Sequence, residues 1–314
     1  MMQSVISDKI LGMNEDLQQT PYKSGFVAVM GRPNVGKSTL INALLGQKVA
    51  AVSPRPQTTR KRQLGILTRE DAQVVFVDTP GVHKALHKLG ESMNRNAAET
   101  LQESDVILLV VDVSQPPQPE DLLLIKLVDD LKRPKPTILA LNKADLLDEV
   151  RQGANAAPYQ ALIPSAVALP VSSMLNQNLE LLLELILDRL DASEPFFPSD
   201  QITDLYEREI AADLIREAAL IILRDEIPHG IAVRIDQYQE RGETGAYIEA
   251  TLFVERESHK PIVIGQGGQM LKRIGTQARQ KIEQMSGRKV YLQLKVKVRK
   301  NWRDDEQVLR WFGF

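Results

Sequence analysis

The 314-residue sequence contains no cysteine and no long apolar run. Without cysteine, the chain can form no disulfide framework, thiolate metal site or cysteine nucleophile. Its longest uninterrupted apolar stretches, such as 106–111 and 218–223, are far shorter than the roughly 20 residues that a membrane-spanning helix needs. Asp8, Glu15 and Asp16 interrupt any signal-peptide pattern at the N-terminus. We therefore expect a soluble, intracellular protein, and its length predicts two domains.

The net charge of −2 hides an uneven distribution of charged residues. Residues 256–314 carry 14 Lys and Arg against 5 Asp and Glu, and Glu283 is the only acid between 260 and 303. Such a basic segment is typical of nucleic-acid-binding surfaces. Charge alone leaves a solvated basic surface equally open, because the overall pI is about 6.2.

Short apolar runs alternate with helical patterns through the first part of the chain, which predicts βα units on a mainly parallel sheet. Two prolines in 193–200 (SEPFFPSD) disfavour a continuing helix and favour a domain boundary there. We therefore expect a flexible extension over 1–22, a first, α/β domain over 23–192, a linker over 193–203 and a second domain over 204–314. The apolar runs expected to be strands are 26–30, 74–77, 106–111, 137–141 and 169–171.

The second domain is predicted to be a smaller α+β unit. Residues 290–299 alternate strictly between apolar and polar side chains, which predicts a strand with one buried face and one largely basic face. The other elements expected there are helices over 204–224 and about 268–285 and strands over 233–238 and 246–255.

Residues 31–38 (GRPNVGKS) match the pattern G-x-x-x-x-G-K-S, directly after a predicted strand and before a helical pattern. Gly31 and Gly36 let the backbone curl so that successive N–H groups point at phosphate oxygens. Lys37 can reach the β- and γ-phosphates of a nucleotide, and Ser38 can offer its hydroxyl to Mg²⁺. In this context the pattern predicts a P-loop rather than a chance glycine turn.

Residues 78–81 (DTPG) close the next strong strand. A carboxylate at this strand end suits Mg²⁺ through water, and Gly81 can lend a flexible N–H to the γ-phosphate. DTPG alone is a common turn. Behind a P-loop it predicts a switch element.

Residues 142–145 (NKAD) follow another predicted strand and indicate the base. The Asp145 carboxylate can accept hydrogen bonds from N1–H and the 2-amino group of guanine, whereas adenine has no such donor pair. Lys143 can lay its aliphatic stem over the base, and Asn142 can brace the loop. The alternative is a helix-start cap, which the spacing after the other two motifs disfavours.

The chain resembles the Era family of ribosome-assembly GTPases over about 24–314. The motifs that carry the resemblance are GRPNVGKSTLIN at 31–42, PQTTR at 56–60, DTPG, NKAD and Ser172-Ser173. The resemblance implies that 56–60 is the first switch, with Thr59 (or Thr58) as its Mg²⁺-binding threonine, and that 171–174 touches the guanine edge. The family loop usually reads Ser-Ala followed by glycines, and here it reads SSMLN.

Motifs and resemblance together predict a site for GTP or GDP with Mg²⁺. The resemblance also allows K⁺ near Asn34. Lys37, Thr59, Asp78 and Gly81 are expected to act in hydrolysis, with Ser38 and Thr59 as the Mg²⁺ ligands. The residues expected to bind nucleotide are Gly31, Arg32, Pro33, Asn34, Val35, Gly36, Lys37, Ser38, Thr39, Asp78, Thr79, Pro80, Gly81, Val82, Asn142, Lys143, Ala144, Asp145, Ser172, Ser173 and Met174.

Residues 265–268 (GQGG) stand before the second helical pattern of the second domain. Such small residues let a loop approach a sugar–phosphate chain, and the helix N-terminus behind them adds donors. Two strands ahead and a basic strand behind match a KH domain, of type II in the related family, although a plain helix-start turn is the alternative. The residues expected to contact RNA are Gly265, Gln266, Gly267, Gly268, Lys272, Arg273, Lys295 and Lys297.

The resemblance implies the biological setting. It points to the 3′ end of small-subunit ribosomal RNA, to assembly of the small ribosomal subunit and to the cytoplasm, and it leaves open a peripheral contact with the inner face of the plasma membrane. We expect a monomer.

Val82 follows DTPG where some GTPases place a water-orienting Gln, so we expect slow intrinsic hydrolysis. One rival is a nucleotide-regulated binding module in which hydrolysis is incidental. A GTPase with tandem nucleotide domains is disfavoured by the single P-loop. A tRNA-modification GTPase is disfavoured by the length of the chain.

We expect the aromatic tail, 302–314, to fasten the last helix to the second domain, with base stacking as the alternative.

Overall fold

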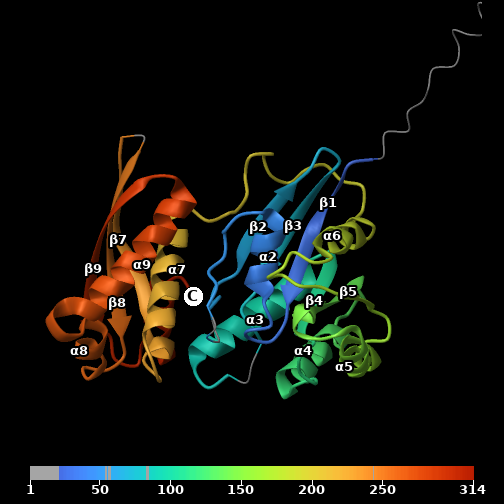
Figure 1. The fold of residues 1–314 in the computed structure, drawn as a ribbon, viewed down its shortest axis with the longest axis horizontal. Helices are drawn as coiled ribbons and strands as arrows, with labels where there is room; N and C mark the ends of the chain where they lie inside the picture. The colour runs from blue at the N-terminus through green and yellow to red at the C-terminus, as the bar shows by residue number, and fades with distance from the viewer. Residues whose placement is uncertain (1–20, 54, 56–57, 83–84, 243) are drawn as a thin grey trace, which may run out of the picture.

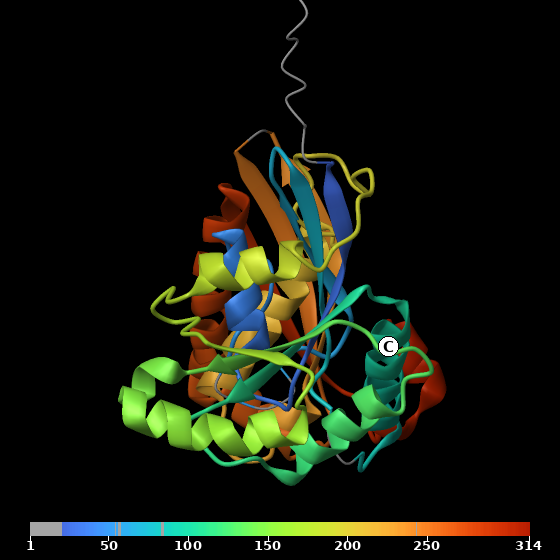
Figure 2. The same cartoon turned by 90° about the vertical axis from the view of Figure 1, so that its right-hand side faces the viewer.

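The computed structural model describes residues 21–314 except 54, 56–57, 83–84 and 243, so all but the last two residues of the expected extension (1–22) lie outside the described residues. The chain forms two units that lie side by side in Figure 1, and the second lies behind the first in Figure 2. Each unit has a sheet and helices of its own.

The first unit contains a six-stranded sheet in the order β2-β3-β1-β4-β5-β6. β2 runs antiparallel to β3, and the other neighbouring pairs are parallel, as the βα alternation predicts. All five expected strands are present, and Val171 lies just beyond the last one. The strands are β1 (Lys23–Met30), β2 (Gln63–Thr68), β3 (Ala72–Asp78), β4 (Val106–Asp112), β5 (Thr137–Asn142) and β6 (Val167–Pro170).

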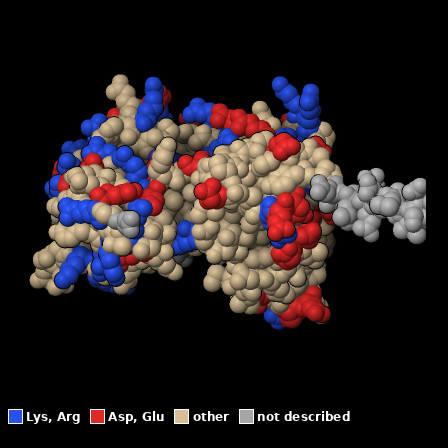
Figure 3. Space-filling view, turned by 90° about the horizontal axis from the view of Figure 1, so that it is seen from above, with Lys and Arg blue, Asp and Glu red and all other residues tan. Residues whose placement is uncertain are grey.

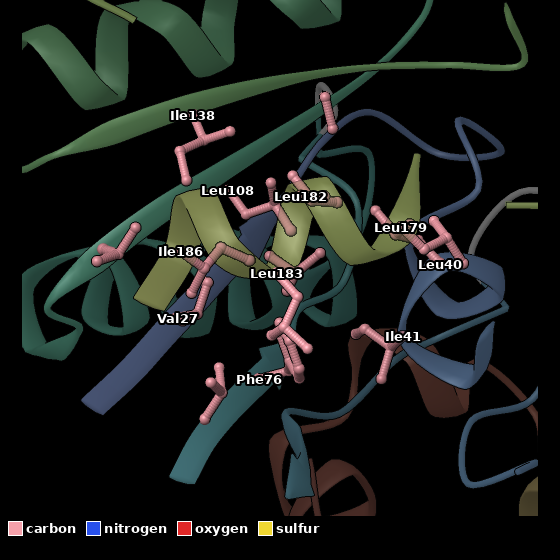
Figure 4. Packing of buried hydrophobic residues seen from close by; sticks show 14 of the residues in the cluster. Val27, Leu40, Ile41, Phe76, Leu108, Ile138, Leu179, Leu182, Leu183 and Ile186 are labelled. Carbon is pink, nitrogen blue, oxygen red and sulfur yellow. The ribbon is translucent and has the colours of Figure 1, made fainter. Parts of the chain in front are cut away.

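Helices cover both faces of this sheet. On one face α2 (Lys37–Leu45) and α6 (Leu179–Leu187) pack on apolar side chains of the central strands, and Figure 4 shows Leu182, Leu183 and Ile186 pointing into that core. The leucines of α6 that face the sheet therefore belong to the core. The opposite face is covered by α3 (Lys88–Glu103), α4 (Pro119–Asp129) and α5 (Glu149–Leu162).

The second unit is the expected α+β domain. Its sheet has the order β7-β8-β9, with β7 antiparallel and β9 parallel to β8. Along β9 the side chains alternate between exposed and shielded, which confirms the two-faced strand. The elements are α7 (Glu207–Ile222), β7 (Ala232–Arg241), β8 (Gly245–Val254), α8 (His259–Ile264), α9 (Gln269–Ser286), β9 (Lys289–Val298) and α10 (Glu306–Trp311).

The segment 193–203 crosses from α6 to α7 in contact with the first sheet. The side chain of Gln73 accepts hydrogen bonds from the amides of Phe196 and Phe197 at 2.8 and 3.0 Å. Further along, Ile202 accepts a bond from the amide of Ile66 in β2 at 2.9 Å. We propose that this segment links the two domains and packs along the first one.

Candidate nucleotide and nucleic-acid sites

The loop 31–36 leaves β1 and enters α2 through tightly packed glycines. A Cβ on Gly31 would lie 2.4 Å from the carbonyl oxygen of Val110, and one on Gly36 would lie 2.3 Å from Nδ2 of Asn142. Gly36 also has a φ of +101°, which side chains rarely adopt. The fold therefore requires glycine at both positions of the P-loop pattern.

Lys37, the first residue of α2, is folded back over the loop. Its Nζ donates to the carbonyls of Gly31 at 3.0 Å and Arg32 at 3.2 Å, and the side chain is buried. Burial lowers the pKa of Lys37 to about 8, although Asp78 acts in the opposite direction. An anion at the loop would stabilise the charged ammonium.

Ser38, Thr59 and Asp78 converge from three segments. Oδ2 of Asp78 accepts hydrogen bonds from Ser38 at 2.8 Å and Thr59 at 3.1 Å, while Oδ1 is buried without a hydrogen-bond partner. Burial raises the pKa of Asp78. Such hard oxygen donors fit Mg²⁺. Thr58 bonds instead to Ser53 and to the carbonyl of Arg55, so the geometry favours Thr59 as the switch threonine.

Asn142 joins the P-loop to the 172–176 loop. Its Nδ2 donates to the Val35 carbonyl at 2.7 Å, and its Oδ1 accepts from the amide and the hydroxyl of Ser173, both at 3.1 Å. This is the bracing contact expected from NKAD. Ser172 is likewise buried, whereas Met174 is exposed.

The remaining NKAD residues lie at the surface edge of the same site. Asp145 is exposed in the short turn after β5, where its carboxylate can meet a base. Lys143 adopts a left-handed backbone and pairs with Asp112 at 2.7 Å. Although burial opposes it, hydrogen bonds from Lys143 and Ser114 keep the pKa of Asp112 below its usual value.

Two buried acids near the site lie outside the sequence motifs and were not predicted. Asp112 ends β4, and Asp121 lies in the first turn of α4; Asp121 pairs with Arg32 at 3.3 Å. Asp112 ends a strand between the P-loop and NKAD strands, and that position is the one signal that could have identified it. These acids hold Lys143 and Arg32 in place beside the nucleotide loops.

DTPG lies against the P-loop. A Cβ on Gly81 would come within 2.7 Å of the Pro33 amide nitrogen, so this residue must also be small. Thr79 is buried and donates to the carbonyl of Val29 at 2.9 Å, and Val82 is buried among apolar side chains. A cavity of about 50 Å³ is bounded by P-loop residues, by Gly81 and by described residues of 51–59.

The described residues of the first switch touch the second domain, a contact that the sequence did not predict. Residues 56–57 lie outside the described residues. Arg60 donates to the carbonyls of Ile231 and His229 at 2.7 and 2.8 Å, directly after Thr59. Just before the switch, Arg55 donates to the carbonyls of Leu220 and Leu223, both at 2.6 Å. Arg55 and Arg60 therefore connect the first domain to the second domain through hydrogen bonds to backbone carbonyls.

The GQGG loop lies between α8 and α9. Gly265, Gly267 and Gly268 all have positive φ values, of 74°, 56° and 78°. A Cβ on Gly265 would lie 2.7 Å from Met270, but one on Gly267 or Gly268 would meet nothing within 4 Å. The outer half of the loop is thus open to a ligand, beside the N-terminus of α9.

A groove runs from this loop between α9 and the edge strand β9. It encloses about 340 Å³ and includes Gly268, Lys272, Arg279 and the exposed Tyr291. Arg279 and Tyr291 were absent from the predicted RNA contacts, because only the packing of α9 beside β9 places them there. In the view of Figure 3, Lys and Arg gather over this domain.

The two predicted lysines of β9 differ in their surroundings. Both are exposed on the same face of the strand, but Lys295 forms an ion pair with Glu249. The expected loop cation Arg273 is exposed near the start of α9. Neither lysine lines the groove between α9 and β9, and Arg273 does not line it either.

The aromatic tail packs as predicted and also reaches the first domain. Trp302 is fully buried and donates to the Gly230 carbonyl at 2.9 Å. Its cluster includes Phe312 and also Leu89 and Met93 of α3. Nδ1 of His87, at the start of α3, lies 3.1 Å from Oδ2 of Asp304 in the tail. Within the described residues, no group of three or more His, Asp or Glu side chains could hold a metal ion.

Comparisons with known proteins agree with these two sites. Residues 26–143 match the family model described as a 50S ribosome-binding GTPase, and residues 226–303 match the KH domain model. The chain is 42% identical over 293 residues to GTPase Era of Ruminiclostridium cellulolyticum and 44% identical over 292 residues to that of Heliobacterium modesticaldum. These alignments span 93% of this chain and 98% and 97% of those proteins.

Two solved structures are similar to the whole described fold. One is Era in complex with MgGDPNP and nucleotides 1506–1542 of 16S ribosomal RNA, with a TM-score of 0.88 and 39% identity. The other is an Aquifex aeolicus Era variant bound to GDP and aluminium fluoride, with a TM-score of 0.87 and 40% identity. Each comparison covers 93% of this chain and 99% of the other. The chain, with its P-loop domain followed by a KH domain, belongs to the Era family of GTPases.

Proposed function

We propose that this GTPase binds the 3′-terminal segment of small-subunit ribosomal RNA and acts in assembly of the small ribosomal subunit. The observation that carries the proposal is that one chain joins a complete P-loop site to an open GxxG loop beside a basic groove. The similar Era structure with a 16S ribosomal RNA fragment supports the same RNA for this chain.

In the proposed mechanism the P-loop amides and Lys37 hold the phosphates, and Asp145 selects guanine. Ser38 and Thr59 would hold Mg²⁺, with Asp78 behind them as the buried acceptor. When bound, this ion neutralises charge on the phosphates. K⁺ near Asn34 stays a prediction from the family resemblance.

The attacking water must be oriented by groups other than the side chain of Val82. The Val82 side chain is buried and apolar, so it cannot orient water by hydrogen bonding. Catalytic help would then come from the backbone, the first switch or a bound cation, and we therefore propose a slow intrinsic rate. Multiple-turnover phosphate release tests this: steady GTP turnover is expected, and a single turnover would favour the rival in which hydrolysis is incidental.

The RNA proposal is tested by titrating the full chain with the 3′-terminal segment of 16S ribosomal RNA and with a scrambled segment of equal length. We expect preferential binding of the native single strand. Lys37→Ala serves as the control, because it should lose nucleotide binding and keep the KH contact. Equal affinity for both RNAs would contradict sequence-selective binding.

Location and oligomeric state are proposed on the resemblance. Among the described residues, no helix is long and apolar enough to cross a membrane. We propose a cytoplasmic monomer, and peripheral membrane contact remains a prediction that co-sedimentation with anionic vesicles would test.

A further inference from the structure

A cavity of about 430 Å³ lies between the two domains, apart from the nucleotide loops and the GxxG groove. Residues 60–63 form one wall directly after Thr59, and α7, the start of β7 and the last residues of the tail form the others. Seven Lys or Arg side chains line it against two acids, Glu209 and Asp213. A cavity with this excess of cations has the charge of an anion site.

Several of these cations are already paired. Arg216 lies 3.6 Å from Asp213, Arg62 lies 2.7 Å from Glu103, and Arg234 pairs with Asp236. Arg310 lies 3.8 Å from Glu306.

Three cavity cations lack such an acid. Within the part of the chain that the structure describes, Arg60, Lys61 and Arg208 form no ion pair. Arg60 and Arg208 donate only to backbone carbonyls. Arg60 lies over the ring of Trp302 at 5.6 Å and Lys61 over the ring of Phe314 at 5.2 Å. The cavity lining therefore carries more positive than negative charge, and three of its cations are held without an ion pair to an acid of the described residues.

Arg60, one of these three cations, lies in the protein interior. Its side chain is 3% exposed, and its Nε is buried without a hydrogen-bond partner. A buried cation with an unsatisfied donor costs free energy, and a bound anion would offset that cost.

Phosphate is the anion that suits this lining. Guanidinium groups bind phosphate oxygens through paired N–H donors, and Lys61 adds a compact point charge. We propose that the cavity is a second phosphate-binding site, which takes one or more phosphate groups. Because Arg60 follows Thr59, a phosphate held here would join the first switch to α7 and the tail. The phosphate would come either from a small free ligand or from the backbone of bound RNA.

The test is a calorimetric titration of the full chain with pyrophosphate, in saturating GDP and without free divalent cations. We expect one saturable site. Lys61→Gln combined with Arg208→Gln should weaken it by about tenfold or more, because two charged donors are lost. Both residues are exposed and lose only a ring contact with Phe314 and a 3.4 Å bond to the Ile235 carbonyl, so the melting temperature of the double variant should stay close to that of the parent. Arg69→Gln is the matched control, since Arg69 lies outside the cavity and pairs with Glu180 and Glu184.

A second arm repeats the titration with oligouridine present. Weaker pyrophosphate binding by the parent chain in the presence of oligouridine would identify RNA backbone as the source of the phosphate. Pyrophosphate binding without competition would identify a small free ligand. No pyrophosphate binding, or equal binding by the double variant, would overturn the proposal.

Discussion

The two glycine loops of this protein differ in how closely the fold surrounds their glycines. In the P-loop the glycines are surrounded by their own fold, with the backbone of Val110 and the side chain of Asn142 where a Cβ would stand. In the GQGG loop, Gly267 and Gly268 have open space around them. The backbone of the P-loop is therefore fixed by the residues packed around it. The GQGG loop needs glycine for its positive φ values, and the space beside Gly267 and Gly268 is open.

Gly36→Ala should have the largest effect. The substitution meets both a forbidden φ and a 2.3 Å contact with Asn142, so GDP affinity should fall by about a hundredfold or more as the loop is displaced. Calorimetric GDP titration measures this. Gly46→Ala is the control at the other end of α2, where φ is +67° and nothing lies within 4 Å; it should cost about 1 kcal/mol of stability and leave GDP affinity unchanged. Wild-type affinity in Gly36→Ala would contradict a preformed loop.

Gly267→Asp combined with Gly268→Asp should break the second loop without touching the first. Two carboxylates would repel the phosphates, and RNA affinity should fall by about a hundredfold. GTP affinity should stay within about twofold, since the P-loop is unchanged. Gly267→Ala with Gly268→Ala imposes the same backbone strain without charge and should retain most RNA binding. If the helix-start turn were the whole role of GQGG, the aspartates would lower stability and leave RNA affinity per folded molecule unchanged.

Asp145→Asn should change base choice. The variant places an NH₂ group opposite a guanine donor, which costs on the order of 1–3 kcal/mol of GTP binding. Xanthine carries an acceptor where guanine has its amino group, so XTP should recover part of the loss. Competition between GTP and XTP measures the change, with Asp148→Asn, a cap of α5, as the control. A variant that still prefers GTP would show that another group reads the base.

The buried lysine predicts a smaller, pH-dependent effect in the P-loop. Lys37 has a pKa of about 8 without nucleotide, and bound phosphates should raise it, so the charged form is the one that binds. GDP affinity should therefore be constant well below this pKa and fall by about fourfold between pH 7 and 8.5. Titrations at the two pH values measure the change. If the Lys37→Arg variant binds GDP, its affinity should not change over this pH range. A GDP affinity that does not change with pH in the parent would show that Lys37 does not contact the phosphates.

Much of the fold and of the nucleotide site could be predicted because its signals are local. The motifs at 31–38, 78–81 and 142–145 each follow a strand, and parallel strands bring their carboxyl ends to one edge of the sheet. The prediction omitted β2, a short edge strand after the first switch whose Gly65 must be small because Ile41 lies where a Cβ would stand. Its weak pattern becomes a strand by pairing with β3.

By itself, the sequence determined the P-loop, the guanine motif and the alternation of β9, because each depends on residues close together in the chain. Only the tertiary structure decided that Asp112 holds Lys143, that Tyr291 lines the groove beside the GQGG loop and that Arg60 and Lys61 enter a cavity between the domains. These contacts join residues far apart in sequence. Burial and charge at such positions are set by which surfaces meet, and no local pattern records that.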